Sequence, residues 1–275
     1  MKQGFVKVAS ATPRIRVADP VYNAQVICEQ AKEAAEHGAK IVVFPELCIT
    51  GYTCNDLFLQ ELLLEKAKEA LLTIAEETGQ LETLFLVGLP VDKDGRLYNV
   101  AAVLYRGRIL GMIPKKNIPM YAEFYEGRHF TPGEETVTEY RLGKQVIPFG
   151  SNLLFRCEEL PELILGCELC EDLWVAEPPS TSHALMGATV IANLSASNET
   201  VSKDDYRTLL IKASSARLLC GYIYTSAGEG ESTQDLVFGG HDLIAENGTL
   251  LVQSARFTTG IPVSYTHLRA HETDS

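Results

Sequence analysis

The sequence predicts one α/β domain in which helices cover a mixed β-sheet, and three observations lead to this fold class. Short apolar runs at 40–44, 84–88 and 188–194 have the length and composition of strands buried on both faces. Apolar residues at helical spacing lie between several of these runs. Turn sequences such as Asp94-Gly95 join further strands as hairpins. Strand–helix pairs alternating with hairpins favour two sheets packed face to face, although periodicity alone does not establish that detail.

In the first third of the chain, residues 5–9 alternate weakly and predict a strand. Asp19 and Pro20 have the residue types of an N-cap and a first helical position, and Gly38 is a suitable end for the helix that they begin. A second, longer helix is expected over residues 55–79.

The middle of the chain is predicted to contain hairpins followed by a long irregular stretch. The strand over 98–105 follows the Asp94-Gly95 turn, and a second turn at 106–108 leads to a strand over 109–113. Residues 114–160 contain several prolines and glycines and are expected to be irregular. A loop of this length in a compact domain is usually functional.

In the last third of the chain, predicted strands and helices alternate again. It predicts a strand at 163–165, helices over 182–186 and 204–220, a strand at 222–225 and a terminal hairpin formed by 239–244 and 249–252.

Composition excludes several function classes. The 275 residues carry a formal net charge of -12, which argues against a nucleic-acid-binding protein because such a protein needs a basic face. No stretch approaches the roughly 18 apolar residues of a membrane span. The N-terminus has no pattern of an export signal, and the odd number of seven cysteines lacks framework spacing. We therefore expect a cytoplasmic protein with reduced thiols and no membrane or nucleic-acid partner.

Residues 262–275 have no apolar periodicity and hold two of the six histidines. They are typical of a translated sequencing-adaptor sequence, which predicts a non-native tail and a natural chain cut at about Ile261. A flexible native C-terminus is the alternative. The predicted domain is therefore 1–261.

Three chemically useful residues follow predicted strands. Glu46 comes after the run at 40–44, Lys115 after the strand at 109–113, and Cys170 after the strand at 163–165. Ligand sites in open α/β folds lie at the carboxyl ends of strands. A thiolate nucleophile, an ammonium that lowers its pKa and a carboxylate that moves protons would form a hydrolytic site. Each residue alone has a simpler interpretation, as a solvated acid, a surface lysine or a structural thiol.

Cys170 also forms a C-x-x-C pair with Cys167, which is compatible with zinc binding or disulfide exchange. Zinc is disfavoured because no second ligand pair of suitable spacing is present, so no metal is expected. Cys167 lies within the apolar strand run and is expected to be a buried structural thiol. Cys48 and Cys54 are rival nucleophiles near Glu46 that lack the neighbouring acids.

Residues 44–47 (Phe-Pro-Glu-Leu), 114–115 (Pro-Lys) and 170–172 (Cys-Glu-Asp) occur in this order. Together they resemble the nitrilase, or carbon–nitrogen hydrolase, superfamily. The resemblance covers about residues 4–258 and implies a four-layer αββα sandwich with a Glu-Lys-Cys triad. Further stretches narrow it to the amidase domains of glutamine-dependent NAD synthetases; they are residues 119–126, 170–174, 193–197 and 228–233.

The resemblance implies a role for each matching residue. Glu46 would be the general base, Cys170 the nucleophile, and Lys115, with Lys116 as the fallback, the cation that holds the oxyanion together with the Glu171 N–H. The glutamine-contacting positions would be Tyr121, Glu171, Ser197 and Lys203. Lys203 stands where relatives may carry arginine, and lysine lacks the bidentate guanidinium fork.

The implied reaction converts glutamine to glutamate and ammonia, which would pass to a C-terminal synthetase domain that uses ATP and Mg²⁺ to convert deamido-NAD to NAD. Neither a P-loop nor a dinucleotide fingerprint occurs in these 275 residues, so no cofactor is expected in this chain. A homo-oligomer is also implied.

Three alternatives remain open. The first is a stand-alone amidase or carbamoylase of the same superfamily that acts on another small amide. The second is a catalytically silent assembly domain in which residues 228–232 form an interface loop. The third, a redox or zinc role for Cys167 and Cys170, is the least favoured.

Overall fold

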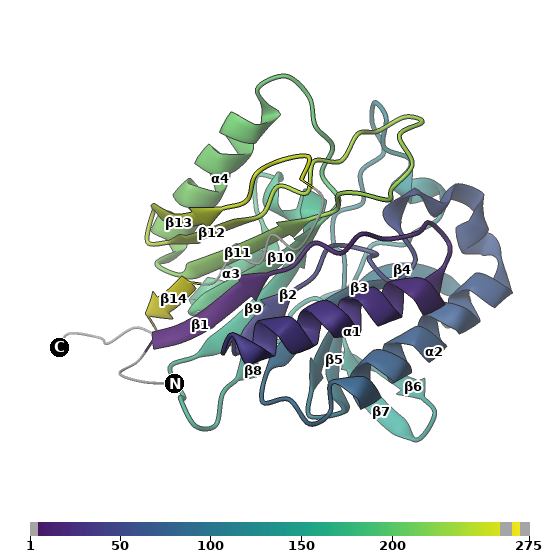
Figure 1. Ribbon diagram of the computed structural model, residues 1–275, viewed down its shortest axis with the longest axis horizontal. Coiled ribbons are helices and arrows are strands. Elements are labelled where there is room, and N and C mark those ends of the chain that lie inside the picture. Colours follow the sequence, from purple (N-terminus) through teal and green to yellow (C-terminus); the bar gives the residue numbers. More distant parts are fainter. Residues whose placement is uncertain (1–4, 259–265, 270–275) are drawn as a thin grey trace.

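Two β-sheets packed face to face form the centre of the molecule (Figure 1). The computed structural model describes residues 5–258 and 266–269. Within that part of the chain, the first sheet has eight strands, in the order β14 (Thr266–Arg269), β1 (Phe5–Ser10), β2 (Ile41–Val43), β3 (Leu84–Lys93), β4 (Arg96–Tyr105), β5 (Arg108–Pro114), β7 (Gln145–Phe149) and β6 (Thr138–Leu142). The second has six, in the order β13 (Thr249–Gln253), β12 (Leu243–Glu246), β11 (Gly221–Ser226), β10 (Val190–Ser195), β9 (Ile164–Leu169) and β8 (Phe155–Arg156).

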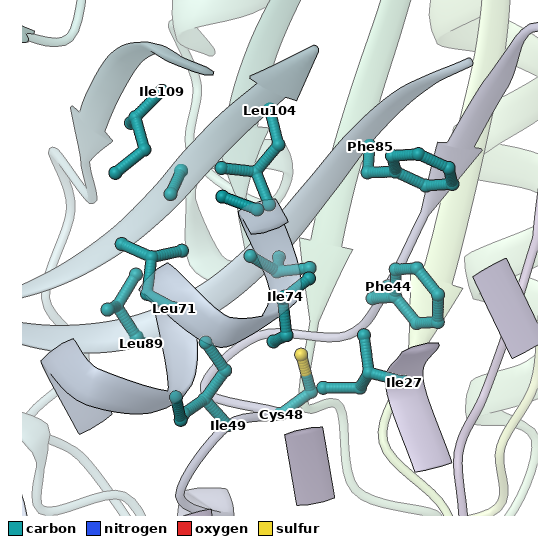
Figure 2. Close-up of a cluster of buried hydrophobic side chains, with 14 of the residues drawn as sticks. Ile27, Phe44, Cys48, Ile49, Leu71, Ile74, Phe85, Leu89, Leu104 and Ile109 are labelled. Atoms are coloured by element: carbon teal, nitrogen blue, oxygen red, sulfur yellow. The ribbon is translucent and has the colours of Figure 1, made fainter. Parts of the chain in front are cut away.

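Helices form the two outer layers. α1 (Pro20–Glu36) and α2 (Glu61–Glu77) lie side by side against the eight-stranded sheet, and α3 (Pro179–Leu185) and α4 (Lys203–Leu218) cover the six-stranded sheet (Figure 1). Ile27 of α1 and Ile74 of α2 pack with Phe44 and Phe85 in the core between the helices and the first sheet (Figure 2). The predicted four-layer αββα sandwich is therefore confirmed.

The two sheets meet through a separate apolar layer. Alternate residues of the central strands face inward, as the period of two requires. The first sheet contributes Val6, Val8, Ile41, Val43, Leu86, Ala101, Val103 and Ile113, and the second contributes Leu165, Cys167, Leu169, Val190, Ala192, Leu194, Ile223 and Ile244. Strands such as β2 and β10 carry buried residues on both faces, which explains their continuous apolar runs.

The helix start at Asp19-Pro20 and the hairpin turn at Asp94-Gly95 form as the sequence predicts. The Asp19 carboxylate accepts a hydrogen bond from the Tyr22 N–H at 3.1 Å, and Pro20 is the first residue of α1. Asp94 and Gly95 both have positive φ angles in the turn between β3 and β4, which is the geometry of a type I′ hairpin.

Two predictions of secondary structure were wrong. The helix expected over 55–79 is divided into a 3₁₀ segment, η1 (Tyr52–Leu59), and α2, because Asn55 has non-helical angles and Gln60 is extended. The stretch 114–160, expected to be irregular, contains the β6–β7 hairpin, β8 and a short η2 (Glu126–Arg128). The hairpin was difficult to predict from the sequence because Pro148 lies within β7, and proline usually interrupts strands.

The tail prediction falls mostly outside the described residues, as does Ile261. Residues 266–269 form β14, which pairs antiparallel with β1, whereas the sequence pattern assigned no element there. The non-native origin of 262–275 stays a prediction. Among the residues that the structure describes, none of the helices has the length and apolar character of a membrane span.

Candidate active site

Glu46, Lys115 and Cys170 come together at one edge of the sandwich. They directly follow or lie close to the carboxyl ends of β2, β5 and β9. Lys115 Nζ lies 2.7 Å from Glu46 Oε1, and the charges of both side chains act on the Cys170 thiol. Glu46 and Lys115 are fully buried and Cys170 is 6% exposed. The structure therefore brings the three predicted residues into one buried cluster.

Close backbone packing places Glu46. A Cβ on Gly88 of β3 would lie 2.2 Å from the Leu47 nitrogen, so only glycine lets the 45–47 backbone approach this strand. The Glu46 N–H donates to the Ser195 carbonyl at 3.3 Å, which joins the ends of β2 and β10. Asn99 Nδ2 donates to Glu46 Oε1 at 2.7 Å. Glu46 Oε2 has no hydrogen-bond partner within the described residues and is the oxygen able to accept a proton.

A second carboxylate, Glu126, completes the cluster, and sequence reasoning gave it no role. Its Oε1 accepts from Lys115 Nζ at 2.6 Å and from the Tyr52 hydroxyl at 2.8 Å, while Oε2 is 3.4 Å from Asn99 Nδ2. Glu126 lies in the stretch 119–126 that carries the family resemblance. The only available signal was an acid in the long loop after Lys115, and that does not specify a partner.

The balance of charges in this cluster is set by burial and by the two carboxylates. Burial opposes the charge of Lys115, but Glu126 and Glu46 outweigh it and hold the pKa of the ammonium well above its usual range. Burial raises the pKa of Glu46; Lys115 works against this rise and Glu126 adds to it. Lys115 is therefore a fixed cation, and Glu46 is a carboxylate able to gain and lose a proton.

Cys170 stands at a strained turn between β9 and the short η3 (Cys170–Leu173). Its φ of 41° lies in the left-handed region, which is uncommon for a residue with a side chain and is often found at functional sites. Burial, followed by the Glu46 charge, raises the pKa of Cys170 to about 12, and Lys115 lowers it by less. The Lys115 ammonium therefore acts in the expected direction, but burial outweighs it, and a base must remove the thiol proton before the sulfur can attack.

Asp172 ties this turn to the loop after Lys115. Its Oδ2 accepts from the Leu169 N–H at 3.1 Å and the Lys116 N–H at 3.4 Å. Its Oδ1 accepts from both the backbone N–H and the side-chain amide of Asn117 at 2.8 Å. Because Asp172 is buried, these bonds fix the position of the nucleophile turn relative to Lys115.

A cavity of about 470 Å³ opens onto Cys170. All four predicted substrate-contacting residues line it: Tyr121, Glu171, Ser197 and Lys203. The Tyr121 hydroxyl donates to the Glu171 carboxylate at 2.9 Å, and burial raises the pKa of both groups. The cavity therefore presents an acid and a hydroxyl near the nucleophile.

Lys203 supplies the positive charge of the cavity. It begins α4, its ammonium donates to Asn198, and it lies over the rings of Trp174 at 5.3 Å and Phe124 at 5.6 Å. Burial lowers its pKa. Behind this wall, the buried Arg207 guanidinium donates to Ser197 Oγ at 3.3 Å and to the Asn198 carbonyl at 3.1 Å. Sequence reasoning missed Arg207, whose polar side chain gave no sign of its burial.

The rival candidates lie elsewhere. Lys116 forms a partly exposed ion pair with Glu135, so Lys115 is the lysine of the cluster. Cys167 contributes to the apolar layer between the sheets. The thiols of Cys48 and Cys54 are buried against the Gly88 and Thr50 carbonyls, and neither lines the cavity that opens onto Cys170.

Comparison with known proteins identifies the family. The profile of the carbon–nitrogen hydrolase family matches residues 7–275. The chain belongs to the carbon–nitrogen hydrolases. It is therefore an enzyme with a hydrolase component, and the buried Glu-Lys-Cys cluster is its candidate catalytic centre.

This carbon–nitrogen hydrolase is similar to several named synthetases. It is 43% identical over 260 residues to the glutamine-dependent NAD(+) synthetase of Mycobacterium bovis, covering 94% of this chain and 38% of the relative. The synthetase of Thermotoga maritima is 32% identical over 249 residues, which is 90% of this chain and 39% of the relative. The chain thus spans about two fifths of the curated relatives that it matches.

Solved structures of similar proteins have the same fold. A glutamine-dependent NAD(+) synthetase from Cytophaga hutchinsonii superposes with a TM-score of 0.87 at 28% identity, covering 98% of this chain and 44% of that one. An amidase of the nitrilase superfamily from Nesterenkonia matches with a TM-score of 0.74 at 21% identity over 96% of this chain and 92% of that one, which shows a shared fold.

The hydrogen bonds by which Asp172 holds the Cys170 turn to the loop after Lys115, here called the Asp172 clamp, can be tested by measuring the stability of the folded chain. Asp172→Ala should lower the free energy of unfolding by about 2 kcal/mol or more, because it leaves the buried Leu169 N–H and the part-buried Asn117 N–H unpaired. Urea unfolding measures the change. Asp205→Ala, at an exposed position of α4, is the control and should change stability by less than about 0.5 kcal/mol. Equal stabilities of the two variants would contradict the clamp.

Proposed function

We propose that this chain hydrolyses the side-chain amide of glutamine to glutamate and ammonia through a thioester on Cys170. The observation that carries the proposal is the buried contact of Lys115 with Glu46 and Glu126 beside a thiol at the wall of an open cavity. The 43% identity to a protein named for its dependence on glutamine supports the choice of substrate.

The cavity offers complementary groups for a free amino acid. The Lys203 ammonium would pair with the α-carboxylate of glutamine, and the Glu171 carboxylate would attract its α-ammonium group. Tyr121 and Ser197, which also line the cavity, would add hydrogen bonds. Glutamine bound in this way would extend its amide toward Cys170.

The first half-reaction uses Glu46 as base. Its Oε2 takes the proton of the Cys170 thiol while the sulfur attacks the amide carbon. The negative charge that develops on the carbonyl oxygen would be held by the Lys115 ammonium and the Glu171 N–H, an early N–H of η3 that has no acceptor inside that helix. Glu46 then returns the proton to the departing nitrogen. Ammonia is released, and the glutamyl group remains bound to Cys170 as a thioester.

The second half-reaction repeats the proton transfers with water. Glu46 takes a proton from a water molecule that attacks the thioester carbonyl, and the same two donors, Lys115 and the Glu171 N–H, hold the oxyanion. Cleavage of the carbon–sulfur bond releases glutamate, and Cys170 regains its proton from Glu46. The sum is glutamine plus water giving glutamate plus ammonia.

Because the chain spans 38% of the relative's length, the activity of a whole synthetase is a further step of this proposal. The ammonia would be delivered to a synthetase domain of the same protein, where ATP and Mg²⁺ would drive amidation of deamido-NAD to NAD. Assembly into a homo-oligomer is part of the same expectation, and sedimentation of the chain would measure it.

The substrate assignment can be tested by ammonia release. We expect the chain to turn over glutamine with a kcat/KM at least about 100-fold above that for aliphatic amides or carbamoyl compounds, since only glutamine offers both charged groups to the cavity. Preferential hydrolysis of propionamide or a carbamoyl amino acid would favour the stand-alone amidase or carbamoylase instead.

Lys203→Met should raise the KM for glutamine by about tenfold and leave kcat within about threefold, because the lost contact is to the α-carboxylate and not to the reacting amide. Steady-state kinetics measure both constants. The KM for an aliphatic amide without an α-carboxylate should not change. Lys212→Met on the same helix, outside the cavity lining, is the control. An unchanged KM for glutamine in Lys203→Met would contradict this role.

Glu126→Gln should shift the acid limb of the kcat/KM profile to lower pH. Glu46 acts as a base only when deprotonated, and the charge of Glu126 raises its pKa. Loss of that charge lowers the Glu46 pKa, so activity persists to more acidic pH even though kcat falls. Profiles between about pH 5 and 9 test this. Glu134→Gln, at an exposed carboxylate, should keep the wild-type limb.

A further inference from the structure

The proposed hydrolysis uses none of residues 228–232, whose sequence is Gly-Glu-Gly-Glu-Ser. This 228–232 loop follows β11 and is fastened to the segment after β1. The Ile15 N–H donates to the Glu229 carbonyl at 3.1 Å. Gly230 has a φ of 104°, and a Cβ there would lie 1.9 Å from the Ile15 carbonyl oxygen. Only glycine fits, so the path of the loop is fixed on both sides of Gly230.

This fixed path delivers Glu231 to the start of η1. The side chain is buried, and its Oε1 accepts from the Tyr52 N–H at 2.7 Å. Its Oε2 accepts from the Thr53 N–H at 3.0 Å and from Thr53 Oγ1 at 2.6 Å. The N-cap residue of η1 is Gly51, which has no side chain to accept these bonds. Glu231, 179 positions from Tyr52, is therefore the cap of η1.

The other end of Tyr52 reaches the catalytic cluster. Its hydroxyl donates to Glu126 Oε1 at 2.8 Å, and the same oxygen accepts from Lys115 Nζ at 2.6 Å. Its ring packs edge-on against Phe238, with ring centroids 5.8 Å apart. Burial holds the pKa of Tyr52 well above its usual range, so the hydroxyl remains a donor. One residue thus connects Glu231 to Glu126.

We infer that Glu231 is a positioning residue for this hydrolysis: by capping η1 it fixes Tyr52, and through Tyr52 it holds Glu126 and the Lys115 ammonium in place. The inference rests on the proposed function for its kinetic consequences. It also gives residues 228–232 a role inside the chain that differs from an interface loop. The neighbouring Glu229 has no such connection, because it pairs with the exposed Arg14 at 3.0 Å.

Glu231→Gln tests the inference, with Glu229→Gln as a control two residues away. Glutamine places an NH2 donor where one carboxylate oxygen accepts from either the Tyr52 N–H or the Thr53 N–H, so one of these bonds is lost and η1 and the Tyr52 hydroxyl shift. We expect kcat for glutamine to fall about tenfold. The KM should stay within about twofold, because residues of the cavity are untouched. A kcat equal to that of Glu229→Gln, or a loss confined to KM, would overturn the inference.

A double-mutant cycle with Tyr52→Phe tests the path through Tyr52. The phenylalanine variant keeps the packing on Phe238 and loses only the hydrogen bond to Glu126. If Glu231 acts through that bond, the double variant should have nearly the same kcat as the more impaired single variant. If the factor by which kcat falls in the double variant were the product of the factors in the two single variants, the two residues would act independently and the inference would be overturned.

A readout that needs no turnover separates this inference from the proposed function. The rate of Cys170 alkylation by iodoacetamide, followed by mass spectrometry of its peptide, reports the thiol and its neighbours. Since Lys115 lowers the Cys170 pKa, its displacement should slow alkylation several-fold in Glu231→Gln and not in Glu229→Gln.

A wild-type chain that does not hydrolyse glutamine would defeat the proposed function, while the alkylation rates would still decide the role of Glu231. If Glu231→Gln does not fold, Thr53→Val removes the hydroxyl that donates to Glu231 and accepts from the Ser232 N–H, and it should also slow alkylation. Alkylation of Thr53→Val at the wild-type rate would overturn the inference.

Discussion

Cys170→Ala should reduce glutamine hydrolysis by about 10⁴-fold or more, because removal of a nucleophile leaves only binding and oxyanion stabilisation. The reason lies in the positions of the two cysteines of the C-x-x-C pair. Cys170 faces the cavity beside Glu46 and Lys115. Cys167 belongs to the apolar layer between the sheets.

Cys167→Ala is the matched control. It removes a buried sulfur from that layer, so it should lower stability by about 1 kcal/mol and keep kcat near the wild-type value. Ammonia release and mass-spectrometric trapping of an acylated Cys170 measure the two effects. Full hydrolysis by Cys170→Ala would exclude the thioester mechanism. Equal losses in the two variants would point to a dithiol chemistry.

Lys115→Met should abolish hydrolysis and lower the free energy of unfolding by about 3 kcal/mol or more at neutral pH. The methionine keeps most of the side-chain volume but leaves Glu46 and Glu126 buried without their shared cation. Removing one partner of a buried ion pair costs far more than the pair contributes, because the remaining charge is desolvated and uncompensated.

The pH dependence of this loss has a definite sign. Burial raises the pKa of Glu46 and Lys115 opposes that rise, so without Lys115 the Glu46 pKa lies further above its value in the unfolded chain. The folded state then binds this proton more tightly, so the deficit is largest at neutral pH and shrinks as the pH falls and Glu46 becomes neutral. Urea unfolding of both proteins at several pH values measures it.

Lys116→Met, one residue away, is the control. Lys116 makes a partly exposed pair with Glu135, and such pairs contribute at most about 1 kcal/mol. We expect its activity and stability to stay close to those of the wild-type chain. If Lys116→Met were the inactive variant and Lys115→Met the active one, the catalytic assignment of Lys115 would be wrong.

The positions of the three predicted catalytic residues were accessible from sequence because each stands beside a strand end. Glu46 follows β2, Lys115 follows β5 and Cys170 follows β9, and the structure brings these ends to one edge. The preference for Cys170 over Cys167 had the same basis, since a residue inside an apolar strand run is expected in the core.

Glu126 and Asp172 could not be assigned from sequence, because their partners lie on distant elements. Glu126 meets Tyr52 across 74 positions, and Asp172 meets Asn117 across 55. No periodicity or local motif relates such positions. The start of η1 at Tyr52, ahead of the expected helix, was hidden for a related reason, since its cap comes from the remote Glu231.

The sequence by itself determined the α/β class, the strand ends that carry Glu46, Lys115 and Cys170, and the likeness to the carbon–nitrogen hydrolases, because these follow from local patterns along the chain. The four-layer arrangement was implied only by that likeness. Only the tertiary structure decided that Lys115 is shared by two carboxylates and that burial raises the pKa of the Cys170 thiol. Both depend on burial and on distances between remote residues: desolvation opposes the thiolate more strongly than one ammonium stabilises it.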